Sequence, residues 1–315
     1  MKSYFSYKVC YQVSNTMTSR QSSKFVKTVR GLPFPDLPWF TEVNLIGSLD
    51  YVPHDGDIVI ASYPKTGTTW LQYIVHQITS RGQKPPSMEV MTYRIIPLVD
   101  MAGVEVIESL TEPRIYKHHL PYSATRRNPN CKYLYIHRNP EDVMVSYYHF
   151  MQNLMEQELD FDEFFEGFMT GHIGYGRYFE HVLSYMDVEN VLRISYKNLR
   201  SNRKDEVLRI AKFIGQSHFE DIVNDGSVLE RILEHTSFDY MKKNISFTHP
   251  MPKITENSTV LKDLDKVKTV DFFRKGEVGE GKKALTSNQL KRMSELMKQI
   301  MKDTDFVDEW QDHQK

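Results

Sequence analysis

The sequence predicts an α/β fold: a single domain with a central parallel β-sheet flanked by helices. Short segments rich in β-branched and aromatic residues alternate with amphipathic helical segments along the 315 residues. This alternation is typical of a parallel sheet covered on both faces. The chain has neither an internal repeat nor a clear interdomain linker. We therefore expect one domain over residues 25–315, preceded by a poorly ordered extension at residues 1–24.

The elements follow in chain order. Residues 32–53 hold prolines at positions 33, 35, 38 and 53, which predicts a mostly extended or turning stretch. Strands are predicted over residues 57–63, 115–117, 132–138 and 191–195. Helices are predicted over residues 69–80, 140–151, 205–214 and 288–302. The second helix starts at Asn139-Pro140-Glu141-Asp142, which combines an N-cap, a first-turn proline and acidic residues. Residues 240–270 have little periodicity, which is typical of a lid.

Charge, cysteine content and hydropathy exclude several classes of protein. The formal net charge is −1, so no global basic field favours nucleic acid or an anionic membrane, and an anionic ligand needs a local cluster of Lys and Arg. Cys10 and Cys131 provide no disulfide framework, which favours a reducing compartment. No apolar run is long enough for a signal peptide or a membrane span. We expect a cytoplasmic protein.

The segment Tyr63-Pro64-Lys65-Thr66-Gly67-Thr68-Thr69-Trp70 lies between the first strand and the first helix. Backbone N–H groups and the helix dipole favour an anion at such a helix N-terminus. Lys65 adds a charge, Gly67 allows close approach, and three threonines add hydroxyls. The order differs from the G-x-x-x-x-G-K-[ST] loop that binds ATP. By itself the segment also fits an ordinary polar turn.

A second group of cations lies elsewhere in the chain. Arg138 follows a predicted strand, where ligands usually bind in an open α/β sheet. Ser146 lies two helical turns further on, and the segment 272–276 (FFRKG) adds two cations beside a glycine. Each cation alone is most often solvated. Together with the loop at 63–70 they are able to hold a nucleotide with phosphates at both ends.

Taken in order, these segments resemble those of the cytosolic sulfotransferase family, over roughly residues 25–305. The loop at 63–70 resembles the family's 5′-phosphosulfate loop, with Thr66 where Ser is usual. The other similar segments are Lys117-His118-His119-Leu120-Pro121, Arg138 to Phe150, His235-Thr236-Ser237-Phe238 and Arg274-Lys275-Gly276, and Tyr196 follows its strand where the family has a Tyr that contacts adenine. Five ordered motifs make a chance match very improbable.

The resemblance implies transfer of a sulfuryl group from 3′-phosphoadenosine 5′-phosphosulfate (PAPS) to a hydroxyl, or an amine, of a small apolar or phenolic acceptor. The nucleotide 3′-phosphoadenosine 5′-phosphate (PAP) is then the product. His119 is implied as the general base, with His118 as its neighbour. Lys65 and Lys117 would stabilise charge, and Ser146 would bind the 3′-phosphate and hold Lys65 back. The residues implied to bind the nucleotide are Lys65, Thr66, Gly67, Thr68, Thr69, Trp70, Arg138, Ser146, Tyr196, Thr236, Phe238, Phe273, Arg274, Lys275 and Gly276.

Candidates for an apolar pocket wall are Phe34, Tyr148, His149 and Phe150, although aromatic residues are as often core. Phenols, catecholamines, steroids and simple alcohols all stay open as acceptors. No His/Cys/carboxylate cluster has metal-ligand spacing, so no metal is expected.

Two departures from the family pattern stand out. The family's G-D-W after Arg-Lys-Gly is Gly279-Glu280-Gly281 here, so the Trp is missing. Its C-terminal dimer motif is degraded at Ser287 and Lys291, which leaves a homodimer open.

Two other functions compete with this interpretation. A small-molecule kinase would use the loop for ATP, but the order of the loop is wrong and no acidic pair is clearly placed for Mg²⁺. A silent nucleotide-binding or ligand-binding protein is the second alternative. The presence of Lys65, Lys117 and His119 argues against a silent binding protein, whereas the missing Trp keeps that alternative open.

Overall fold

The structure is a computed structural model that describes residues 26–155, 158–245, 247–249, 268–270 and 276–311. The predicted extension at 1–24 and most of the predicted lid lie outside these residues. The strands are β1 Val26–Val29, β2 Leu32–Pro35, β3 Ile58–Ser62, β4 Ile115–His118, β5 Lys132–His137, β6 Val191–Ser195, β7 Phe247–His249 and β8 Lys268–Val270.

Helices account for most of the remaining described chain. They are α1 Glu42–Asp50, α2 Thr68–Thr79, α3 Met88–Val90, α4 Val99–Ala102, α5 Val104–Glu108, α6 Pro140–Met155, α7 Phe161–Thr170, α8 Tyr178–Ser184, α9 Tyr196–Ser201, α10 Arg203–Ile214, α11 Gln216–Asn224, α12 Gly226–His235, α13 Phe238–Asn244, α14 Glu280–Ala284, α15 Ser287–Ile300 and α16 Phe306–Gln311. A π-helical turn spans Met91–Ile95 and a 3₁₀ turn spans Tyr122–Ala124.

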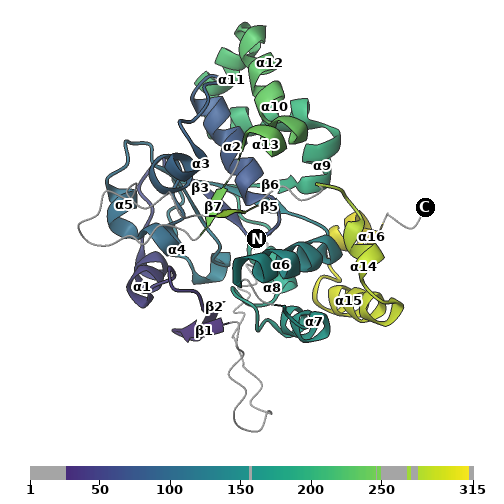
Figure 1. Ribbon diagram of the computed structural model, residues 1–315. Helices are drawn as coiled ribbons and strands as arrows, with labels where there is room; N and C mark the ends of the chain where they lie inside the picture. The colour runs from purple at the N-terminus through teal and green to yellow at the C-terminus, as the bar shows by residue number, and fades with distance from the viewer. Residues whose placement is uncertain (1–25, 156–157, 246, 250–267, 271–275, 312–315) are drawn as a thin grey trace, which may run out of the picture.

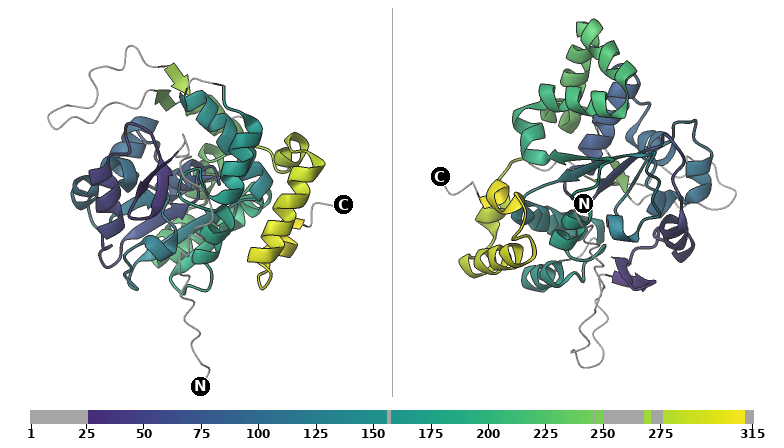
Figure 2. Two further views of the ribbon diagram at one scale, coloured as in Figure 1. Left: turned by 90° about the horizontal axis from the view of Figure 1, so that it is seen from below. Right: turned by 180° about the vertical axis from the view of Figure 1, so that it is seen from behind.

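A parallel sheet with the strand order β4-β3-β5-β6 forms the centre of the fold. Successive residues of a strand face opposite sides, so Val59 and Ile60 enter two different hydrophobic clusters. Helices α2 and α10 to α12 cover one face, and α6 to α8 cover the other (Figure 1; Figure 2 shows the same layers from behind). This confirms the predicted α/β class. The chain passes from β4 on one side of β3 to β5 on its other side, so β3 ends at the topological switch point where ligands bind in such sheets.

The predicted strands and helices are present with shifts of a few residues, and two predictions need correction. Residues 32–53 are extended or turning as predicted except for one helix that was not predicted: α1 forms between Pro38 and Pro53, with the Thr41 side chain accepting from Asn44 N at 3.2 Å. The helix that begins at Pro140 continues to Met155 rather than to Met151. Its predicted cap is confirmed, since Asn139 Oδ1 accepts from Glu141 N at 3.2 Å.

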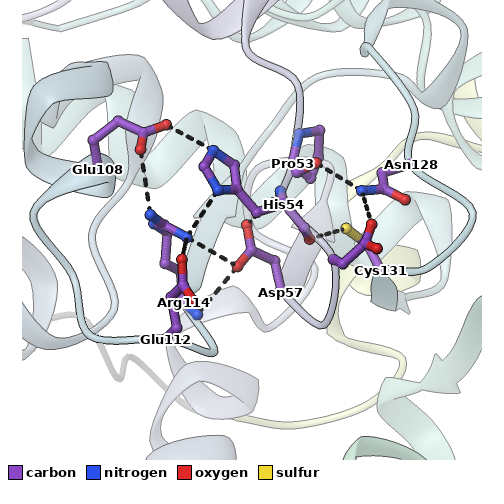
Figure 3. A network of polar contacts seen from close by, with 9 residues as sticks. Pro53, His54, Asp57, Glu108, Glu112, Arg114, Asn128 and Cys131 are labelled. Atoms are coloured by element: carbon purple, nitrogen blue, oxygen red, sulfur yellow. Dashed lines mark hydrogen bonds and ion pairs between the residues drawn. The ribbon is translucent and has the colours of Figure 1, made fainter.

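A polar network ties the amino ends of the central strands together, at the edge opposite the switch point (Figure 3). Asp57, just before β3, accepts from the backbone N–H groups of Arg114 at 3.2 Å and of His54 at 2.9 Å. The Cys131 thiol, just before β5, donates to the His54 carbonyl at 2.8 Å. Arg114 also pairs with Glu112 at 2.8 Å. These contacts fix the starts of β3, β4 and β5, and so the register of the strand ends that carry the candidate site.

Candidate active site

A cavity of about 330 Å³ opens at the carboxyl ends of β3 and β4. Its lining combines three cations, Lys65, Lys117 and Arg138, with hydroxyl and imidazole groups and a largely apolar remainder. These residues come from the loop after β3, from β4, and from the start of the segment after β5. The structure thus brings together side chains that the sequence separates by more than 70 positions.

The loop after β3 contains two residues with positive φ, Lys65 and Gly67. Gly67 has φ +115°, and an added Cβ would lie 2.8 Å from the Tyr196 ring, so glycine is required there. Lys65 has φ +70°. That region is unfavourable for a side chain by roughly 1–2 kcal/mol, and such strain clusters at ligand sites. Thr66 is fully buried and donates to the Tyr63 carbonyl at 2.9 Å, so it holds the turn rather than lining the cavity.

Lys117 is the last-but-one residue of β4 and is buried. Its ammonium donates to Gln72 Oε1 at 2.8 Å, and Gln72 in turn donates to the Ile96 carbonyl at 2.9 Å. Burial lowers the pKa of Lys117 to about 7 because a charged amine loses its hydration there. An anion in the cavity would favour the protonated form.

His119 follows β4 and lines the same cavity. Its Nδ1 lies 2.8 Å from the Ser62 carbonyl oxygen. A carbonyl only accepts, so Nδ1 carries the proton and Nε2 holds the free lone pair of the neutral ring. Burial lowers the pKa of His119 to about 3, so the ring is neutral at pH 7. Its neighbour His118 is buried, and His118 Nδ1 accepts from Leu120 N at 3.2 Å.

Aromatic rings lie between the loop and Arg138. Trp70 and Tyr196 pack edge to face with ring centroids 5.4 Å apart, and the Arg138 guanidinium lies 4.4 Å from the Tyr196 ring centroid. Trp70 Nε1 donates to the Thr236 carbonyl at 2.9 Å, and Thr236 is fully buried. Arg138 Nε is buried without a hydrogen-bond partner among the described residues. A buried donor of this kind is suited to an anionic ligand.

The segment 276–281 closes this part of the cavity and is held by α6. Asp142 accepts from Gly279 N at 2.9 Å and from Gly281 N at 2.7 Å, and its carboxylate lies 3.5 Å from Arg138. An added Cβ at Gly281 would overlap the Glu141 carbonyl group. A tryptophan side chain therefore has no room on this backbone path, which explains the departure noted at Gly281.

The predicted site residues fall into three sets. The cavity is lined by Lys65, Gly67, Thr68, Thr69, Trp70, Lys117, His119, Arg138, Ser146, His149, Phe150, Tyr196, Phe238 and Gly276. Thr66, Thr236, Phe34 and Tyr148 are not among its lining residues. Phe34 is fully buried against Tyr175, and Tyr148 donates to the Leu159 carbonyl at 2.9 Å. Phe273, Arg274 and Lys275 lie outside the described residues.

Sequence reasoning missed most of the apolar wall. It comes from segments before α1, from the region of α3 and α4, from α6, from the loop before α8, and from α13. The missed lining residues are Pro35, Leu37, Trp39, Phe40, Met88, Thr92, Leu98, Met101, Tyr147, Met151, Asn153, Leu154, Tyr175 and Met241. The alternation of Pro with aromatic residues at 33–40 was the one local signal of a wall at this point.

The described residues provide no group of three or more His, Cys, Asp or Glu side chains arranged to hold a metal. In the same part of the chain, no helix combines the length and apolar character needed to cross a membrane.

Fold and cavity define an α/β protein with a cation-lined cavity at the carboxyl edge of its parallel sheet. Residues 55–305 match the family profile described as "Sulfotransferase domain". The chain is 35% identical over 262 residues to sulfotransferase 1C2 of Oryctolagus cuniculus, which covers 78% of this chain and 83% of the relative. It is 36% identical over 265 residues to sulfotransferase 1B1 of Canis lupus familiaris, and this match covers 79% of this chain and 84% of the relative.

Among solved structures, mouse sulfotransferase SULT7A1 complexed with PAP superposes with a TM-score of 0.69 and 25% identity, covering 91% of this chain and 99% of that one. A retinol dehydratase structure shares the fold with a TM-score of 0.66 at 22% identity. The chain belongs to the sulfotransferase family and is a transferase of that type.

Proposed function

We propose that this chain transfers a sulfuryl group from PAPS to the hydroxyl of a small, largely apolar or phenolic acceptor, with His119 as the general base. The observation that carries the proposal is the orientation of His119. Its Nδ1 is committed to the Ser62 carbonyl at 2.8 Å, which leaves Nε2 unprotonated in a ring that lines the cavity beside Lys117.

The lining residues fit the donor. The mouse relative was crystallised with PAP, and this cavity supplies what such a nucleotide needs: cations, hydroxyls, and an aromatic pair at Trp70 and Tyr196. The unpaired Arg138 Nε and the Ser146 hydroxyl would meet its 3′-phosphate. Lys65 and the N-terminal turn of α2 would hold the phosphosulfate. We also assign Phe238 to the adenine and Gly276 to the 3′-phosphate. The two residues are in close contact, since an added Cβ at Gly276 would overlap the Phe238 ring.

When bound, PAPS supplies the sulfuryl group, which forms a bond to the acceptor oxygen as the bond from sulfur to the phosphate oxygen breaks. His119 Nε2 takes the proton of the acceptor hydroxyl, which a neutral imidazole is able to do at pH 7. Lys117 and Lys65 stabilise the negative charge that develops during transfer. The low pKa of Lys117 before binding means that its ammonium is poorly solvated, so its interaction with an anion is strong.

The apolar lining supports a neutral, largely hydrophobic acceptor. Trp39, Phe40 and Tyr147 present rings to the cavity, and Met88 and Met101 present flexible side chains. Methionine adapts to different shapes, which favours a range of acceptors over one closely fitted molecule. Of the sequence-predicted wall, we retain His149 and Phe150. The single-domain extent of residues 25–315 and a cytoplasmic location stay as predicted from the sequence.

The test is a donor comparison on the purified chain. Radiolabelled PAPS and radiolabelled ATP are each incubated with a panel of phenols, steroids and aliphatic alcohols, and the products are separated and identified. We expect label in a sulfated product from PAPS only. Transfer from ATP without transfer from PAPS would support a kinase, and binding of PAP with no transfer to any acceptor would support the silent binding protein.

A further inference from the structure

Asp100 is a buried carboxylate beside His119, and the proposed chemistry does not use it. It lies in α4 and is fully buried. Leu98, which precedes this helix, and Met101 within it both line the cavity. Its Oδ2 accepts from His119 N at 3.1 Å and from the Tyr175 hydroxyl at 3.0 Å. Its Oδ1 is buried and has no hydrogen-bond partner among the described residues. A charged group is rarely buried without a specific task.

His119 needs support because it lies just past the end of β4, an edge strand of the sheet. The paired register ends at His118, so His119 has no strand partner for its backbone. Its N–H donates to Asp100, its carbonyl accepts from His181 Nε2 at 2.9 Å, and its Nδ1 meets the Ser62 carbonyl. Three separate elements thus hold the residue, and Nε2 is the ring nitrogen left for chemistry.

Tyr175 joins Asp100 to the side chain of His119. Its hydroxyl donates to Asp100, while its ring packs at 62° on the His119 ring with centroids 5.4 Å apart. Tyr175 has φ +56°, a conformation that is unfavourable for a bulky residue and persists only where surrounding contacts enforce it. The carboxylate therefore fixes His119 twice, through its backbone N–H and through the Tyr175 ring that packs edge to face against its imidazole.

We propose that Asp100 is a positioning residue for His119, holding the imidazole so that Nε2 faces the acceptor hydroxyl, with Tyr175 as the link to the ring. This rests on the proposed function. The carboxylate touches neither donor nor acceptor in this role. Its effect is on the orientation of the base, and a base displaced by about 1 Å can lose on the order of 100-fold in rate.

The test uses two acceptor probes that differ in their need for a base. Unsubstituted phenol, with a pKa of about 10, must lose a proton during transfer, whereas 2,4-dinitrophenol is already ionised at pH 7. We expect Asp100→Ala to lower kcat with phenol by about 30-fold and with dinitrophenol by less than about 3-fold. The affinity for PAP, measured by calorimetry, should change by less than about 2-fold. Asp50→Ala, at an exposed carboxylate paired with Arg30, is the matched control.

Two further variants keep the proposal testable if Asp100→Ala folds poorly. Asp100→Asn retains an accepting oxygen and should recover most of the phenol rate. Tyr175→Phe retains the ring and loses the hydroxyl, so it should show a smaller loss that is again confined to phenol. Equal losses with both probes, or a loss that follows weakened PAP binding, would mean that Asp100 merely maintains the fold. A wild-type chain that sulfates neither probe nor any other acceptor from PAPS would instead overturn the proposed function and this inference with it.

Discussion

Gly281 offers a sharp test of how the segment 276–281 is attached to the site. A methyl group at this position would lie 2.5 Å from Asp142 N and would overlap the Glu141 carbonyl. Both neighbours are backbone atoms of α6, so no side-chain rotation relieves the overlap. Gly281→Ala must therefore lift the segment from the helix.

The magnitude follows from the hydrogen bonds that break. Lifting the segment removes the donors Gly279 N and Gly281 N from Asp142, at 2.9 and 2.7 Å. A hydrogen bond to a charged group contributes about 1.5–3 kcal/mol, so the two together contribute about 3–6 kcal/mol. Asp142 also lies 3.5 Å from Arg138, which lines the cavity. We expect Gly281→Ala to lose at least about 3 kcal/mol of the free energy that holds the segment 276–281 on α6. This is on the order of 100-fold in the equilibrium constant between the attached and the lifted segment.

The assay is calorimetric titration with PAP, together with urea denaturation to separate ligand affinity from global stability. Gly279→Ala is the matched control. Gly279 has φ +86° and open space around an added Cβ, so that variant bears backbone strain of only about 1 kcal/mol. PAP affinity and stability that are the same in the two variants would refute the close packing of Gly281 on α6.

Two other predictions concern the pKa of Lys117 and the strand starts. Because the pKa of Lys117 is lowered to about 7, its charge is present below that pH, and kcat/KM should fall as pH rises through this value. Gln72→Glu places a carboxylate beside the ammonium, which raises the pKa of Lys117 and should move the fall in kcat/KM to higher pH. A pH profile that does not move would show that another group titrates. Asp57→Ala leaves two backbone donors without an acceptor and should lower the free energy of unfolding, measured by urea denaturation, by about 3 kcal/mol. The control is Asp55→Ala, whose partners are the exposed Asn128 and Asn130 amides, and it should lower that free energy by less than about 1 kcal/mol.

The parts of the site predictable from sequence are those whose chemistry is local. The loop at 63–70 combines the strand end, the glycine and the helix start within eight residues, and Arg138 follows its strand directly. Helix α1 was missed because its flanking prolines, which do not interrupt it, suggested an irregular segment.

Other features depend on contacts between distant parts of the chain. Asp100 and Tyr175 meet across 75 positions, and neither lies in a motif. Likewise, glycine is needed at position 281 only because the residue packs against the backbone of α6. Such contacts are consequences of packing, and no local pattern of residues encodes them.

The role of His119 is the central claim, and single-turnover transfer tests it most directly. Wild type and His119→Ala are mixed with radiolabelled PAPS and phenol, and the sulfated product is measured over one turnover, with PAP affinity measured alongside. We expect the variant to lose about 100- to 10,000-fold in rate while binding PAP with near wild-type affinity. Near-normal transfer by His119→Ala would contradict the assignment of His119 as the base.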